Sequence, residues 1–192
     1  HTENQQWGDA MLKSIGMIEL NSIARAVETA DVMMKAAEVG LVFSKPVCPG
    51  KFIIMISGDV GAVKASIAAG LDRAGQFAVE NFIIPNVSAQ VLNAFNGASP
   101  IEKVNAIGVM EFFNIAASVK AADNAVKAAQ VSLLDIRLGI SIGGKSFVVL
   151  SGDVSAVTEA VESAARESIE EGTLINKAVI SNPSEELFMS LL

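Results

Sequence analysis

The chain of 192 residues contains one cysteine, one histidine and no tyrosine. A single cysteine cannot form a disulfide within the chain, so we expect the protein to reside in a reducing compartment, by default the cytosol. One histidine and no tyrosine leave few candidates for general acid–base catalysis. The phosphate-binding, dinucleotide-binding and nucleophile-elbow motifs are also missing from the sequence. We therefore predict that the protein is not an enzyme.

Long apolar runs and excess positive charge are absent as well. The apolar runs FIIMI and FVVL are the length of strands, far below the ~20 residues of a membrane-spanning helix. The net charge of −7 argues against a nucleic-acid partner, and the missing apolar span argues against a membrane partner. The polar, aperiodic residues 1–12 are predicted to form a flexible tail.

The chain does contain an internal repeat. Residues 15–41 align with residues 107–133 at a spacing of 92, and the pairs 50–63 with 144–157 and 83–91 with 179–187 follow at spacings of 94 and 96. The identical pairs include Gly16/Gly108, Glu19/Glu111, Ile23/Ile115, Asp31/Asp123, Lys35/Lys127 and Val39/Val131. The repeat predicts a duplicated domain, with the first copy at 13–96, a linker at 97–104 and the second copy at 105–192.

Each copy has the same pattern of elements. The first copy predicts strands at 15–20, 41–46, 52–57 and 80–85, and the second predicts them at 107–113, 133–138, 146–151 and 174–180. Ser22 and Asn114 are expected to cap the first helix of each copy, and Asp59 and Asp153 the second. In the first helix an apolar stripe recurs at helical spacing: Ile23, Val27, Ala30, Met34 and Ala37. The order βαββαβ followed by a short helix predicts an α+β fold of two tandem ferredoxin-like domains.

The only cysteine lies in the segment SKPVCPGKF, residues 44–52. Free cysteines are mostly buried and inert, which is the simplest interpretation of Cys48. However, Pro46 on one side and the Pro49–Gly50 pair on the other favour a rigid turn rather than the interior of a strand. One thiolate is too few for a metal cluster. The residues alone therefore indicate a projecting thiol without assigning its role.

The motifs IGMIEL, ADVMMKAAEV and GKFIIMISGDVGAV, together with their similar second copies, resemble the bacterial microcompartment (BMC) shell domain. The resemblance covers about 15–190. Two copies in one chain resemble the tandem class, whose homotrimers form flat pseudohexamers, and the strand-first order resembles the unpermuted arrangement. The Cys48 segment is most similar to the type found in propanediol-utilisation shells. The resemblance implies a structural protein of the microcompartment shell that tiles edge to edge with other shell proteins.

The resemblance also implies a site. The loop between the second and third strands of each domain would line a central pore on the symmetry axis. In this type, one cysteine from each subunit would ligate a 4Fe–4S iron–sulfur cluster for electron transfer across the shell, so Cys48 is the candidate metal and cofactor ligand. The implied pore-lining residues are Val47, Cys48, Pro49, Gly50, Ser141, Ile142, Gly143 and Gly144.

The second loop, RLGISIGGKSF, carries no cysteine, and its simplest interpretation is an ordinary glycine hairpin. Lys35 and Lys127 are solvated helix lysines by the usual expectation, whereas the resemblance implies contacts at the edge of the tile. The family's basic residue after the last strand is missing from IIPNVSAQ and VISNPSEE. Two other functions stay open: a pore for small metabolites with an unmetallated thiol, and a ferredoxin-like regulatory module that binds an effector.

Overall fold

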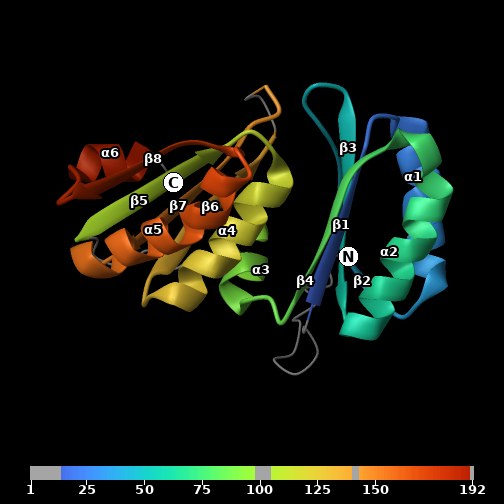
Figure 1. Cartoon of the computed structure of the whole chain (residues 1–192), viewed down its shortest axis with the longest axis horizontal. Coiled ribbons are helices and arrows are strands. Elements are labelled where there is room, and N and C mark those ends of the chain that lie inside the picture. Colours follow the sequence, from blue (N-terminus) through green and yellow to red (C-terminus); the bar gives the residue numbers. More distant parts are fainter. Residues whose placement is uncertain (1–13, 98–104, 140–142, 191–192) are drawn as a thin grey trace, which may run out of the picture. The chain divides into compact units, whose positions relative to one another are not determined.

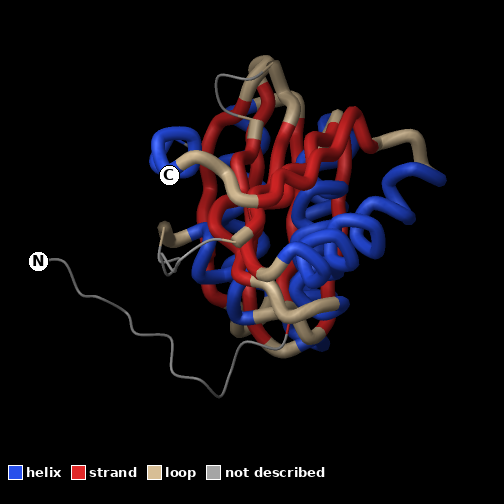
Figure 2. Tube along the Cα trace, turned by 90° about the vertical axis from the view of Figure 1, so that its left-hand side faces the viewer, coloured by secondary structure: helices blue, strands red, loops and turns tan. Residues whose placement is uncertain are grey.

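The computed structural model describes residues 14–97, 105–139 and 143–190. The chain divides into two compact units between Val87 and Ser88, which are described separately below. The expected tail at 1–12 and most of the expected linker, 98–104, lie outside the described residues. The order of elements, β-α-β-β-α-β-α, occurs twice (Figure 1). This confirms the predicted α+β fold of two ferredoxin-like domains. Figure 2 distinguishes the helices, the strands and the loops along the chain.

The first unit contains one antiparallel sheet with the strand order β2-β3-β1-β4. Its strands are β1 (Ser14–Leu20), β2 (Gly40–Val47), β3 (Lys51–Gly58) and β4 (Ala78–Pro85). Helices α1 (Ile23–Ala36) and α2 (Val60–Ala74) cover one face, and the short 3-10 helix η1 (Gly75–Phe77) leads into β4 (Figure 1). The strands lie within two residues of their predicted ends.

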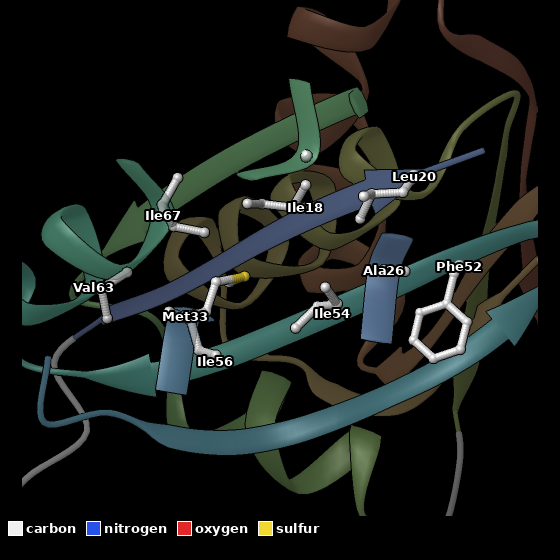
Figure 3. Close-up of a cluster of buried hydrophobic side chains, with 10 residues drawn as sticks. Ile18, Leu20, Ala26, Met33, Phe52, Ile54, Ile56, Val63 and Ile67 are labelled. Atoms are coloured by element: carbon white, nitrogen blue, oxygen red, sulfur yellow. The ribbon is translucent and has the colours of Figure 1, made fainter. Parts of the chain in front are cut away.

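The core of the first unit lies between this sheet and its two helices (Figure 3). Alternate side chains of a strand point to opposite faces of a sheet, so Ile18 and Leu20 of β1 reach the helices together with Ile54 and Ile56 of β3. Gly16 precedes them on the same face. A Cβ atom there would lie 2.7 Å from Cγ1 of Ile67 on α2. The missing side chain therefore lets α2 approach the sheet closely.

Helix α1 begins as predicted, because the Ser22 side chain accepts a hydrogen bond from the backbone N–H of Arg25. Its buried face, however, is not the predicted stripe; the buried residues are Ala26, Thr29 and Met33. Ile23 and Val27 of the predicted stripe are 50% and 58% exposed. Their counterparts in the second repeat, Ile115 and Val119, are 2% and 0% exposed. Helices α1 and α4 therefore share the same apolar periodicity but differ in which of the corresponding side chains are buried.

The second unit repeats the sheet with the order β6-β7-β5-β8. Its strands are β5 (Ala106–Phe112), β6 (Ser132–Leu138), β7 (Ser146–Gly152) and β8 (Leu174–Ser181). Helices α4 (Ile115–Ala128) and α5 (Val154–Glu170) cover one face. On α4, the predicted cap Asn114 accepts a hydrogen bond from the N–H of Ala117 at 2.8 Å.

Two short helices complete the second unit. Helix α6 (Glu185–Ser190) inserts Phe188 among Ile107, Leu134 and Val149. Because Gly108 faces α5, the neighbouring Ile107 points to the opposite side of the sheet, and α6 covers that side. Helix α3 (Ala89–Phe95) ends the first repeat in sequence but packs against β6 and α4 of the second unit (Figure 1).

The paired helices of each unit are joined by an ion pair whose polarity differs between the repeats. In the first unit, Arg73 on α2 donates to Glu28 on α1 at 2.7 Å. At the corresponding positions of the second unit, Lys120 on α4 lies 3.8 Å from Glu167 on α5. The duplication has therefore kept the contact and reversed its charges.

The predicted caps of α2 and α5 need one correction. Asp59 and Asp153 do occupy the N-cap positions, but neither side chain caps its helix. The Asp153 carboxylate instead accepts a hydrogen bond from the side-chain amide of Asn105 at 2.8 Å.

Candidate functional site

The β2–β3 hairpin carries the only thiol. Val47 and Lys51 are the last paired residues of the two strands, and Cys48, Pro49 and Gly50 form the turn between them. Val47 is buried, whereas the turn and the Cys48 thiol are exposed. Gly50 has a φ of 69°, in the region that favours glycine, as its place in the turn predicts. The structure therefore presents the thiol at the tip of a hairpin and not in the core.

A buried ion pair lies at the base of this hairpin. Lys51 Nζ is 2.5 Å from Glu19 Oε1, and the Glu19 side chain is 4% exposed while that of Lys51 is 34% exposed. A buried carboxylate is costly unless it is paired, so the pair fixes the first residue of β3 against β1. From the sequence, Glu19 was noted only as a repeated residue, and Lys51 was not singled out. The available signal was the recurrence of both residues in the second repeat.

The second hairpin joins β6 to β7 and has a longer turn. The N–H of Gly139 donates to the carbonyl of Lys145 at 3.0 Å, and Gly143 and Gly144 have φ values of 66° and 83°. These angles explain the two glycines, since other residues rarely adopt them. The predicted pore residues Ser141 and Ile142 lie outside the described residues.

The base of the second hairpin has the corresponding ion pair, and this pair is more exposed to solvent. Lys145 Nζ lies 3.1 Å from Glu111 Oε1, with the side chains 46% and 38% exposed. The two hairpins thus share a support whose burial differs.

Each hairpin also carries a cation stacked on one of its own aromatic rings. Lys45 Nζ lies 4.6 Å from the ring centre of Phe43, and burial lowers the pKa of the Lys45 ammonium. At the matching position of the second repeat, Arg137 lies 6.0 Å from the ring centre of Phe147 and donates to Asp135 at 2.7 Å. These flanking cations were not singled out from the sequence, although the basic character of the position recurs there.

Comparisons with known proteins assign both repeats of the chain to one family. The BMC domain family matches residues 14–87 and 106–183. The chain is 42% identical over 182 residues to the bacterial microcompartment shell protein PduT of Citrobacter freundii, covering 95% of this chain and 99% of that protein.

This chain belongs to the BMC-domain family of microcompartment shell proteins.

Solved structures agree with this assignment. A crystal structure of a microcompartments protein from Desulfitobacterium hafniense matches with a TM-score of 0.89 and 48% identity, over 93% of this chain and 99% of that one. The fused permuted hexameric shell protein MSM0275 from the RMM microcompartment matches with a TM-score of 0.61 and 26% identity, over 82% and 83% of the two chains. The protein is therefore a structural component of a bacterial microcompartment shell. No helix among the described residues combines the length and hydropathy needed to cross a bilayer.

The two candidate edge lysines of this shell protein lie at the ends of α1 and α4. Lys35 is 74% exposed and pairs with Asp31 at 2.7 Å. Lys127 pairs with Asp123, whose side chain is 3% exposed. Both lysine side chains keep access to solvent, at 74% and 45% exposure.

Cys48 is the candidate metal ligand that the sequence analysis named. Across the residues that the structure describes, no three His, Cys, Asp or Glu side chains gather closely enough to hold a metal ion. Since iron–sulfur clusters take about four thiolates, a cluster at Cys48 requires thiols from several copies of the chain.

Proposed function

We propose that this shell protein forms a homotrimer whose tandem domains make a pseudohexameric tile, with the β2–β3 and β6–β7 hairpins around a central pore. The duplication supports this arrangement, because three chains with two similar domains each supply six similar hairpins. Around the ring, hairpins tipped by Cys48 would alternate with hairpins tipped by Gly143 and Gly144. The pore lining would then be chemically three-fold.

We further propose that the Cys48 thiolates of the three subunits hold a 4Fe–4S cluster in this pore. The donor chemistry fits, since thiolate is the usual ligand of such clusters and the thiol is exposed at the tip of a hairpin. Three thiolates would leave one iron for water or another ligand. When bound, the cluster supplies one-electron transfer, and the shell protein would carry electrons across a barrier that retains metabolites.

The observation that carries this proposal is the exposed thiol on a braced hairpin. Glu19 and Lys51 fix the base of the hairpin, so Cys48 is held at a defined distance from the sheet.

Anaerobic purification with iron and sulfide assays tests the cluster. We expect iron and sulfide in the wild type and neither in Cys48→Ser. Pro46→Ser, on the same hairpin two residues away, keeps the thiol and serves as the matched control. A wild type that contains no iron when purified anaerobically would refute the cluster.

A pore for small metabolites is the alternative. It is favoured because no group of three or more His, Cys, Asp or Glu side chains among the described residues could hold a metal ion. This alternative predicts that wild type and Cys48→Ser lack iron equally and admit the same solutes.

Lys35 and Lys127 are proposed as the contacts between tiles. Electron microscopy of concentrated protein should show hexagonally spaced sheets for the wild type and smaller or no sheets for Lys35→Ala with Lys127→Ala. Lys64→Ala, an exposed lysine on α2, is the control. Extended sheets from the double variant would contradict this role, and their absence from the wild type would favour a small regulatory oligomer.

A further inference from the structure

Helices α1 and α2 lie side by side in the first unit (Figure 1), and they line a groove together with η1. The groove has a volume of about 630 Å³, which is within the range of ligand pockets, about 300–1,000 Å³. Half-buried Val32 on α1 and Ala69 on α2 give its walls an apolar part. All of its lining residues belong to the first unit of one chain. The groove is therefore independent of the homotrimer and of the cluster at Cys48.

Two arginines on the walls of the groove are held by the same acid. Arg25 Nη1 donates to Oε2 of Glu28 at 3.1 Å, and Arg73 Nη2 donates to the same oxygen at 2.7 Å. The arginine side chains are 33% and 44% exposed. A guanidinium carries five N–H donors in a planar fork, and Glu28 takes one from each. Both forks therefore keep donors for a further acceptor, and a phosphate suits them because several of its oxygens can accept at once.

The groove also offers a surface for a flat ring and an acceptor for hydroxyl groups. The Arg25 guanidinium lies 5.6 Å from the ring centre of Phe77, which lines the groove as well. Flat rings stack on guanidinium planes and on aromatic side chains. Exposed Asp72 lines the same groove, and its carboxylate can accept a hydrogen bond from a hydroxyl group.

The charge of the groove runs against the charge of the chain. Among the described residues that line it, two arginines stand against the single acid Asp72. The lining therefore carries a net positive charge in a protein whose net charge is −7. This local excess favours an anionic ligand.

The second repeat shows that the fold does not require these residues. Ala117 stands where the first repeat has Arg25, and Thr173 stands where it has Phe77. The second unit nevertheless keeps an ion pair between its two helices. One such pair is thus sufficient to join the helices, and the additional arginine and aromatic ring of the first repeat need another explanation.

We propose that this groove binds a mononucleotide. The base stacks on the guanidinium of Arg25 and contacts the apolar walls, the phosphate accepts hydrogen bonds from Arg73, and the ribose hydroxyls donate to Asp72. Glu28 stays outside the ligand and holds the two guanidinium groups. The ligand site goes beyond the proposed function and does not rest on it, because one chain supplies every residue.

Isothermal titration calorimetry with three probes tests the class of ligand. The wild type should bind AMP at one site per chain, about tenfold or more tightly than it binds adenosine or inorganic phosphate, because only AMP engages both arginines. AMP that binds no more tightly than phosphate would exclude recognition of the base. AMP that binds no more tightly than adenosine would exclude recognition of the phosphate, and the absence of AMP binding at millimolar concentration would overturn the site.

Substitutions locate the site in the groove. Arg73→Met should weaken AMP binding by about tenfold or more, because it removes charge-assisted hydrogen bonds to the phosphate. Arg25→Ala installs the residue of the second repeat and should weaken AMP binding by about tenfold through the lost stacking. Lys64→Ala removes the same charge from α2 outside the groove lining and should leave the affinity unchanged.

Circular dichroism verifies that all three variants are folded. If Lys64→Ala weakened AMP binding as much as the two arginine variants do, the interaction would be a general effect of charge and the groove would not be the site. Unchanged affinity in both arginine variants would overturn the proposal as well.

Discussion

Replacing Lys51 with methionine should destabilise the first unit far more than Lys145→Met destabilises the second. Lys51→Met leaves the Glu19 carboxylate 4% exposed and without its partner. Breaking a buried pair costs about 3–5 kcal/mol, and we expect about 3 kcal/mol because Lys51 itself is one-third exposed. For a chain of this length that loss lowers Tm by about 6–12 °C. Glu111 is 38% exposed, so Lys145→Met should cost about 1 kcal/mol or less.

Differential scanning calorimetry at one protein concentration compares the two variants. The double variant Glu19→Met with Lys51→Met should recover most of the loss, because an apolar pair of similar volume can replace a buried ion pair. Equal Tm losses in Lys51→Met and Lys145→Met would refute the argument from burial. The same variants should differ in iron content if the hairpin base positions the thiol.

Two further predictions concern packing and pH. Gly16→Ala should lower the free energy of unfolding by about 1–3 kcal/mol, because its Cβ would lie 2.7 Å from Ile67. Gly61→Ala on α2 meets no atom within 4 Å and should raise that free energy by about 0.5–1 kcal/mol; urea denaturation showing equal losses would contradict both. Lys45→Met should stabilise the fold at pH 7, since burial lowers the pKa of Lys45 and penalises the charged form present there. The wild type should regain this stability as pH rises toward 10.5, so a Tm difference that stays constant from pH 7 to pH 10 would argue against it.

The internal repeat made the fold predictable. The order of the elements along the chain, their type and the caps Ser22 and Asn114 follow from short-range patterns that appear twice, and the strand ends were correct to within two residues. Periodicity could not say which face of α1 is buried, because Ile23 and Ile115 have identical patterns and different environments. The packing of α3 on the second unit could likewise not be predicted, because local sequence patterns do not show which distant elements a helix contacts.

The exposed position of Cys48 could be predicted from the sequence, because the residues around it restrict the backbone to a turn. The prolines and Gly50 around Cys48 indicated a projecting turn, and the structure places the thiol there. The brace beneath it was missed because Glu19 and Lys51 are distant in sequence and meet only through the pairing of β1 with β3. The expected pore and edge contacts stay predictions, since both are properties of several chains.

The reversed polarity of the ion pairs Arg73–Glu28 and Lys120–Glu167 has a consequence for folding, because it disfavours mispairing between the two repeats. Two similar repeats on one chain invite exchange, in which a helix of one copy packs on the sheet of the other while both are still folding. If α1 took α5 as its partner, Glu28 would meet Glu167, and α4 against α2 would bring Lys120 to Arg73. Both crossed pairings join like charges and are disfavoured, while each correct pairing joins opposite ones. The opposite polarity of the two ion pairs therefore favours the packing of each helix against its partner in the same repeat.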